Sequence, residues 1–182
     1  EQRAPALPAD PGAVMSVIVG SNTALAVRMA EALFGRPMTG EDFEVVTMAM
    51  IHDSHEVSAA DYVAAQLDAF RIARSLAEFF ETCDVFLCPT LCLPPVKIGE
   101  IDTMANDLSR ITPLLRRYMP ATSLFNMSGQ PAMSVPLAWN KAGLPLGMMF
   151  SARLGDEATL FRLAGQLEQA RPWRDKLPPV SA

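Results

Sequence analysis

Hydrophobic residues along this chain recur mostly at helical spacing. In the clearest stretch, Ser58 and Asp61 have the spacing of a capping box, and apolar residues follow them at helical intervals as far as Phe80. Residues 12–34 are almost continuously apolar except for a polar break at 20–22, which predicts one or two buried helices. Similar patterns predict three further helices, over 39–51, 104–118 and 157–170.

Capping residues mark the expected ends of these helices. Gly35 is suited to the left-handed position that closes the first helix. Thr39 lies three residues before Asp42, which predicts a weak capping box for the second. Asp156 is expected to cap the last helix, and Pro113 to dent the helix that contains it.

Three short apolar runs predict strands, at 85–88, 132–138 and 146–151. The first is a continuous run ended by Pro89, which is typical of a strand buried on both faces inside an α/β sheet. The other two are joined through 140–143, where Asn and Gly suit a turn. Because three strands with apolar edges make a poor free-standing sheet, we expect strands from elsewhere in the same protein to pair with them.

Composition limits the kind of partner. The chain has 182 residues, 50% of them hydrophobic, enough for one domain that buries on the order of 70% of its unfolded surface. Its 15 basic and 20 acidic residues are interspersed and leave a net charge of −5, which favours neither nucleic acid nor a membrane surface. We therefore expect a small-molecule partner. No apolar run approaches the roughly 18 to 20 residues that span a bilayer, and no signal peptide is evident, which predicts a cytoplasmic protein.

The first residues predict a connection rather than an element. Residues 1–12 are rich in Pro and Ala and begin without Met, which is typical of a linker or extended connection inside a longer protein. We therefore expect 1–182 to be a single partial domain. The alternative is a complete domain whose start results from processing or expression.

Three blocks of the sequence resemble a known family in their order and spacing. DVFLCPT (84–90), SLFNMSGQPAMSVPLAWNKAGLPLGMMFSA (123–152) and GDEATLFRLAGQLEQARPW (155–173) resemble the C-terminal part of the amidase signature family of hydrolases. GRPMTGEDFEVVTMAM (35–50) and SAADYVAAQLDAFRIARSLAEFFE (58–81) resemble the bacterial branch that includes 6-aminohexanoate cyclic-dimer hydrolase-like amidases. The resemblance implies an α/β fold, namely the C-terminal portion of an α/β/α sandwich with a mixed central sheet.

The resemblance also implies a catalytic mechanism. Family members use a Ser nucleophile, a bridging Ser in a cis peptide and a Lys that accepts the proton, with an oxyanion hole in a Gly/Ser-rich segment. This chain has no Gly-Gly-Ser-Ser run, and its lysines, in loop or terminal contexts, are Lys97, Lys141 and Lys176. We therefore expect no catalytic residue here and no activity of this chain alone. The N-terminal part of the same enzyme is the expected source of the triad.

What the resemblance leaves to this chain is a wall of the substrate pocket. It implies that Asn22, Thr90, Phe125 and Asn126 approach the triad and bind an amide substrate. Each polar residue has a structural alternative: Asn22 caps a helix, Thr90 finishes a strand, and Asn126 satisfies backbone groups at a corner before Gly129.

Other chemically active residues have structural explanations. The three cysteines, Cys83, Cys88 and Cys92, match no zinc spacing, so we expect them to be small buried hydrophobes. The run 52–55 (His-Asp-Ser-His) is expected to be a solvated helix end, because sequence neighbours do not build a catalytic triad. We therefore expect neither a metal nor a cofactor.

Three functions from different classes remain open. The first is the C-terminal segment of an amidase that hydrolyses carbon–nitrogen bonds of linear or cyclic amides. The second is a transamidating subunit of a tRNA amidotransferase, which the lack of a basic run disfavours. The third is a non-catalytic binding or scaffold relative. A homodimer is the commonest default for the assembled protein, and the sequence does not name the amide.

Overall fold

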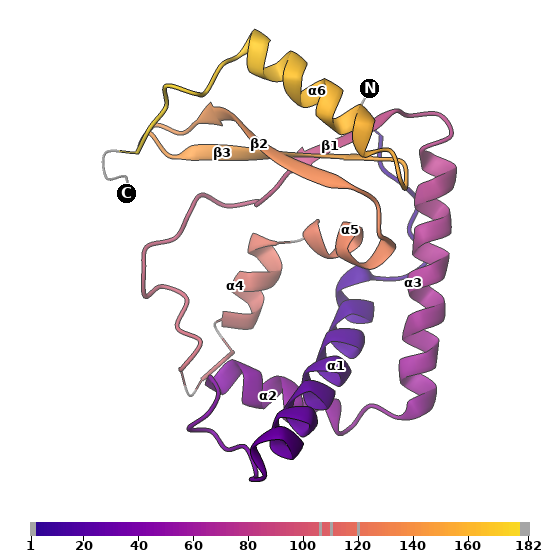
Figure 1. Ribbon diagram of the computed structural model, residues 1–182, viewed down its shortest axis with the longest axis vertical. Coiled ribbons are helices and arrows are strands. Elements are labelled where there is room, and N and C mark those ends of the chain that lie inside the picture. Colours follow the sequence, from indigo (N-terminus) through magenta and orange to yellow (C-terminus); the bar gives the residue numbers. More distant parts are fainter. Residues whose placement is uncertain (1–2, 106, 110, 120, 179–182) are drawn as a thin grey trace.

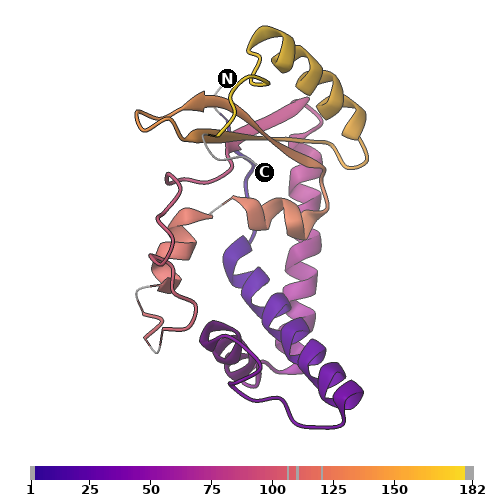
Figure 2. The same cartoon turned by 60° about the vertical axis from the view of Figure 1, so that its left-hand side comes forward.

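The computed structural model describes residues 3–105, 107–109, 111–119 and 121–178. Six helices and three strands are formed within these residues (Figure 1). In chain order they are α1 Pro11–Phe34, α2 Val45–Ser54, α3 Ala59–Phe79, β1 Val85–Pro89, α4 Ile111–Tyr118, α5 Thr122–Ser128, β2 Ala132–Trp139, β3 Pro145–Ala152 and α6 Glu157–Ala170. Helix α6 lies on one face of the sheet, and α5 with α1 lies on the other, in both views (Figures 1 and 2). This layering agrees with the expected α/β class.

The sheet has the order β1-β3-β2, and both strand pairs are antiparallel. Met149 of β3 lies between Cys88 of β1 and Ser134 of β2. The expectation that the first strand is buried on both faces is wrong for the described residues. There β1 forms an edge of the sheet, and Leu87 is 52% exposed. A continuous apolar run indicates that a strand has apolar surface to cover, but it does not indicate what covers it.

Two hydrophobic clusters hold the layers together. On one face of the sheet, α1, α3 and α5 pack against Met149 through a cluster that includes the fully buried Ile72 and Leu76 of α3. On the other face, Leu160 of α6 packs against Val135, Phe150 and Ala152. Strand residues therefore alternate between the two clusters, as the period of two in a strand requires.

Helix α1 is one continuous helix. Asp10 accepts a hydrogen bond from the Gly12 backbone N–H (3.0 Å), Pro11 follows the cap, and Gly35 closes the helix at φ 66°. Ser21 and Asn22 do not interrupt it, because each side chain donates to the carbonyl four residues earlier. The expected connection 1–12 therefore ends at Asp10 within the described residues.

The expectation that this segment is buried is wrong for most of α1. Only Val14 and Gly20 are buried in the described structure, because α2, α3 and α5 contact the helix on limited parts of its surface. By length and composition alone α1 could cross a membrane: an 18-residue window has mean hydropathy 1.4, and 11% of that window is buried. The expectation of no such segment failed because it treated the polar break at 20–22 as an interruption. A helix covered by other protein passes the same test.

The segment before α1 lies against α3. Arg3 stacks its guanidinium on the Phe79 ring (5.3 Å to the centroid) and donates a hydrogen bond to the Thr82 hydroxyl (2.8 Å). Ser75 donates to the Ala6 carbonyl. The extended residues 3–10 are thereby fixed along one helix.

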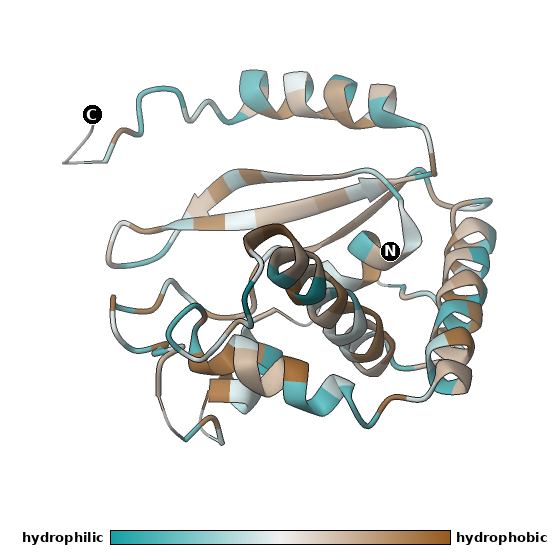
Figure 3. Cartoon of the chain, turned by 60° about the horizontal axis from the view of Figure 1, so that its bottom comes forward, coloured by the Kyte–Doolittle hydropathy of each residue, from teal (hydrophilic) through white to brown (hydrophobic). Residues whose placement is uncertain are grey.

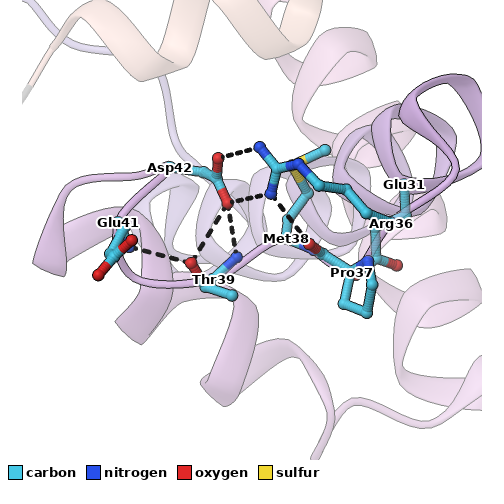
Figure 4. A network of polar contacts seen from close by, with 7 residues as sticks. All are labelled: Glu31, Arg36, Pro37, Met38, Thr39, Glu41 and Asp42. Atoms are coloured by element: carbon cyan, nitrogen blue, oxygen red, sulfur yellow. Dashed lines mark hydrogen bonds and ion pairs between the residues drawn. The ribbon is translucent and has the colours of Figure 1, made fainter.

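Between α1 and α2 the chain folds around a charged pair (Figure 4). Arg36 makes two hydrogen bonds to the Asp42 carboxylate (2.6 and 2.9 Å), and Asp42 also accepts the Thr39 backbone N–H (2.9 Å). The paired guanidinium holds the pKa of the Asp42 carboxyl well below its usual range. The expected capping box at Thr39 is therefore wrong, and α2 begins at Val45. Asp42 orders a loop instead of starting a helix.

The remaining caps and turns largely follow the sequence. Ser58 and Asp61 form the expected capping box of α3, and Asp156 caps α6. Asn140 closes the β2–β3 turn by accepting two backbone N–H bonds. The expected helix 104–118 is wrong in its first half. Pro113 lies in the first turn of the shorter α4, where proline causes no dent, while positions 106 and 110 lie outside the described residues.

Candidate functional site

Thr90 lies where β1 ends and joins two strands. Its backbone N–H donates to the Gly147 carbonyl of β3 (2.9 Å), and its hydroxyl lies 2.6 Å from the hydroxyl of Ser134 on β2. Because β3 lies between β1 and β2, this hydroxyl pair reaches across the middle strand. Strands about 4.8 Å apart permit such a contact only where the middle strand presents no side chain.

Gly147 is the position that lets the two hydroxyls meet. A Cβ atom there would lie 2.8 Å from the Ser134 Oγ and 2.9 Å from the Thr90 Oγ1. Both distances are well inside the van der Waals contact between carbon and oxygen. Glycine at 147 therefore belongs to the site as much as the two hydroxyl groups do.

The hydroxyl pair lies in the wall of a cavity of about 430 Å³, which we call the strand-end pocket. The chain that leaves β1 and the β2–β3 hairpin form its walls. Most of the lining is apolar, and no lining side chain among the described residues is charged. The lining residues are Pro89, Thr90, Leu91, Cys92, Leu93, Pro94, Pro95, Ser134, Pro145, Leu146, Gly147 and Met148.

Thr90 and Phe125 belong to the same side of the sheet. Alternation along β1 puts Phe86, Cys88 and Thr90 on one face, and the Phe125 ring lies over Phe86 with centroids 5.8 Å apart. Phe125 itself is 4% exposed within the first cluster. Its observed contacts are those of a core residue that seats α5 on the sheet.

Asn126 and Asn22 lie outside this pocket. Asn126 is exposed on α5, and the corner beyond it is closed by the Gly129 N–H to the Phe125 carbonyl (3.0 Å) without the Asn126 side chain. Asn22 is exposed in the middle of α1 and donates to Ile18 O (2.8 Å), so it does not cap the helix. The structure therefore brings Thr90 to a pocket and does not bring the two asparagines to that pocket.

Cys88 lies on β1 next to the pocket, and its surroundings disfavour a thiolate. Cys88 is half-buried, and this burial, together with the nearby Cys92, raises the pKa of its thiol. A raised pKa keeps the thiol protonated. Among the described residues, no group of three or more His, Cys, Asp or Glu side chains is placed to hold a metal ion. His52 and His55 lie at the end of α2.

A second cavity, of about 490 Å³, lies between helices. Its walls come from α1, α2 and α4 and include Gly20, Asp53 and Arg116. It is slightly larger than the strand-end pocket but contains none of the residues that the sequence suggested. The strand-end pocket combines a suggested residue with placed hydrogen-bonding groups, so we take it as the candidate site.

Sequence reasoning missed Ser134 and Gly147. Ser134 is the one hydroxyl-bearing residue of β2, and a lone serine in a strand can equally face solvent, so its local pattern does not indicate a site. Gly147 did carry a signal, because an isolated glycine inside a strand pattern often marks a close approach of another group. Which group approaches depends on the strand order, and the order becomes known only from the fold.

The fold and the sequence define the class of protein. Residues 13–161 match the family model described as Amidase, so the chain belongs to the amidase signature family, as its three sequence blocks had suggested. AmiC, an amidase-family protein of Mycobacterium leprae, is 35% identical over 155 residues, which cover 85% of this chain. The 6-aminohexanoate-cyclic-dimer hydrolase of a Pseudomonas species is 32% identical over 154 residues, or 81% of this chain.

A solved structure agrees with this assignment. The structure of a 6-aminohexanoate cyclic dimer hydrolase superposes with a TM-score of 0.79 at 28% identity and covers 92% of this chain. The chain spans 32% of the length of AmiC, 31% of the Pseudomonas hydrolase and 37% of the solved chain. It therefore corresponds to about a third of these relatives.

Proposed function

We propose that this chain is the C-terminal part of an enzyme that hydrolyses carbon–nitrogen bonds of linear or cyclic amides. The observation that carries the proposal is the family match over residues 13–161, in a chain that spans about a third of its relatives. Residues 1–182 then form one partial domain that contributes core and pocket wall. The cytoplasm is its proposed location.

In this proposal the Ser-Ser-Lys triad comes from the N-terminal part of the same enzyme. The placement of the three lysines supports it. Lys141 is exposed in the β2–β3 turn, Lys176 lies over the Trp139 ring (5.5 Å), and none of the three, Lys97 included, lines the strand-end pocket. A lysine that accepts a proton from a nucleophile has to lie within hydrogen-bond reach of the reacting groups.

The proposed substrate contacts are Asn22, Thr90, Phe125 and Asn126, as the family resemblance implies. The pocket that contains Thr90 supports its assignment most directly. Phe125 would act by seating α5, because it is buried, whereas the side chains of Asn22 and Asn126 are exposed and would face the rest of the enzyme. The apolar α1 supports the same view, since a covering protein layer accounts for its exposed hydrophobic residues without a membrane.

A chimeric enzyme tests the proposal. The C-terminal third of the Pseudomonas 6-aminohexanoate-cyclic-dimer hydrolase is replaced by residues 1–182, and amine release is measured for cyclic and linear amides. We expect the chimera to hydrolyse at least one amide and residues 1–182 alone to hydrolyse none. Hydrolysis by the isolated chain would contradict the assignment of the triad to the N-terminal part. A folded chimera that is inactive on every amide would favour a binding or scaffold relative.

A further inference from the structure

The Thr90–Ser134 hydroxyl pair retains hydrogen-bonding capacity after its internal bond is made. Each hydroxyl has one donor proton and two acceptor lone pairs, and the 2.6 Å contact uses one proton and one lone pair. One O–H donor and several acceptor sites remain. Ser134 is exposed and Thr90 half-buried, so these groups are accessible from the pocket. A carboxamide, which has one C=O acceptor and N–H donors, complements this set.

The rest of the strand-end pocket selects against charge. In the part of the chain that the structure describes, its lining consists of proline, leucine, methionine and other uncharged residues, without a lysine, arginine or carboxylate. A carboxylate or ammonium group that entered would lose hydration without gaining an ion pair. The volume of about 430 Å³ leaves room for about 14 water-sized groups at roughly 30 Å³ each. A short aliphatic chain or a medium ring fits this space.

From these two features we propose that the strand-end pocket binds a neutral, mainly aliphatic amide, with the Thr90–Ser134 hydroxyl pair as the anchor of its carboxamide group. Gly147 sets the position of the anchor, because its missing side chain allows the two hydroxyls to meet. The inference rests on the proposed function in one respect, namely that the ligand is an amide substrate or product. Beyond the proposed function, the inference specifies the class of amide, namely one whose pocket-bound part is uncharged.

Direct binding to the 182-residue chain tests the pocket without any hydrolysis. Hexanamide, hexanoate and hexylammonium are titrated by ligand-observed NMR at pH 7 and at the lowest protein concentration that the method allows. We expect hexanamide to bind with a dissociation constant of about 1 mM, as its size permits. The two charged analogues should bind about tenfold more weakly, because each would bury an unpaired charge. Equal binding of all three, or no binding of hexanamide, would overturn the proposal.

Hydroxyl deletions locate the anchor. Thr90→Val and Ser134→Ala remove one hydroxyl each and should weaken hexanamide binding about tenfold, as the loss of a hydrogen bond in an apolar site predicts. Thr112→Val is the matched control, because Thr112 is exposed on α4 and lines the second cavity rather than the strand-end pocket, and it should leave binding at the strand-end pocket unchanged. Far-UV circular dichroism identifies a variant that has lost its fold, and binding is compared only for folded variants. One folded variant, Thr90→Val or Ser134→Ala, is enough to test the anchor.

Unchanged hexanamide binding in a folded Thr90→Val or Ser134→Ala variant would refute the role of the hydroxyl pair as the anchor. The result of this binding experiment can be distinguished from the result of the hydrolysis experiment with the chimera. A pocket that binds hexanamide in an inactive chimera would leave the anchor intact and refute hydrolysis. An active chimera with no hexanamide binding at Thr90 and Ser134 would refute the anchor alone.

Discussion

At the scale of single residues, Gly147 pairs with both neighbouring strands and also leaves the space in which two hydroxyl groups meet. A larger side chain at this position would fill that space. This glycine is a β3 residue, and it is also the gap through which Thr90 and Ser134 meet. Gly147→Ala should force the two hydroxyls apart and destabilise the chain by about 1–3 kcal/mol, the usual cost of overpacking. Differential scanning calorimetry of the purified variant measures the change.

Gly165→Ala is the matched control for this substitution. Gly165 lies inside α6, and a Cβ there would meet nothing within 4 Å. Alanine should stabilise the helix by about 0.5–1 kcal/mol. If both variants shift stability in the same direction, the close approach at Gly147 does not determine the outcome.

A substitution of Asn126 distinguishes a role in substrate binding from a structural role. Its side chain is exposed and does not close the α5 corner, so its removal should cost little stability. In the active chimera, Asn126→Ala should change the ratio of kcat/KM values between amides while the melting temperature stays the same. An equal loss of turnover on all amides, together with a lower melting temperature, would support the structural alternative.

The Arg36–Asp42 pair predicts a specific response to acid. The folded pKa of Asp42 lies below the unfolded value of about 3.9, so the pair's contribution to stability is fully present above that value. It is lost as the pH falls through the lower, folded pKa. We therefore expect the ordered loop to persist at pH 5 and to loosen only in stronger acid. A carbon-13 NMR titration of the Asp42 carboxyl measures this.

Arg36→Gln provides the comparison. Without the guanidinium the Asp42 carboxyl should titrate closer to its unfolded pKa, although the Thr39 N–H bond still favours the ionised form. An identical titration curve in the variant would show that the ion pair is not formed in solution.

At the scale of elements, α3 has two apolar faces. One contains the buried Ile72 and Leu76, and the opposite one contains Val63, Leu67 and Phe70, which are 51 to 66% exposed. Hydrophobic positions recur along this helix in Figure 3, where it lies on the right. A helix with two such faces is typical of one that is covered on both sides.

A pair of identical substitutions distinguishes the two faces. Leu76→Ala should destabilise the 182-residue chain by about 2–5 kcal/mol, because Leu76 is 0% exposed. Leu67→Ala, at 51% exposure, should cost less than about 0.5 kcal/mol. Urea unfolding measures both. In the chimera, Leu67→Ala should become more costly if the N-terminal part covers this face.

The helices and strands that could be predicted from sequence are those with a complete local signal. The Ser58–Asp61 box, the Asp156 cap and the Asn140 turn each specify their geometry within a few residues. The predictions from sequence were wrong where the structure of a segment depends on a contact with another part of the molecule. Asp42 has the spacing of a cap but pairs with Arg36, and the burial of α1 depends on neighbours that sequence does not place.

The candidate site was predictable only in part for the same reason. Thr90 was suggested by the resemblance of the block DVFLCPT (84–90) to the amidase signature family, in which it directly follows the apolar run and Pro89. Ser134 lies 44 residues away, and only the strand order β1-β3-β2 brings it to Thr90. Contacts between strands that are not adjacent in the sheet do not follow from the pattern of any one strand.

At the scale of the whole molecule, apolar surface lies uncovered on several elements. Leu33, Phe70, Leu87 and Phe161 are all more than half exposed, on α1, α3, β1 and α6. Large apolar surfaces and unpaired strand edges promote association. We expect the isolated chain to self-associate as its concentration rises, which light scattering measures. A monomer that stays monodisperse at every concentration would contradict the proposal that a further polypeptide segment covers these surfaces.

The glycine gap in the middle strand also has an evolutionary consequence. Positions 90, 134 and 147 come from three strands but share one small volume, so a side chain can be gained at one of them only if another becomes smaller. The three positions therefore form one unit of variation. In related enzymes, a larger residue at the middle position should accompany the loss of a hydroxyl on a flanking strand, and the depth of the pocket would change in a single coordinated step.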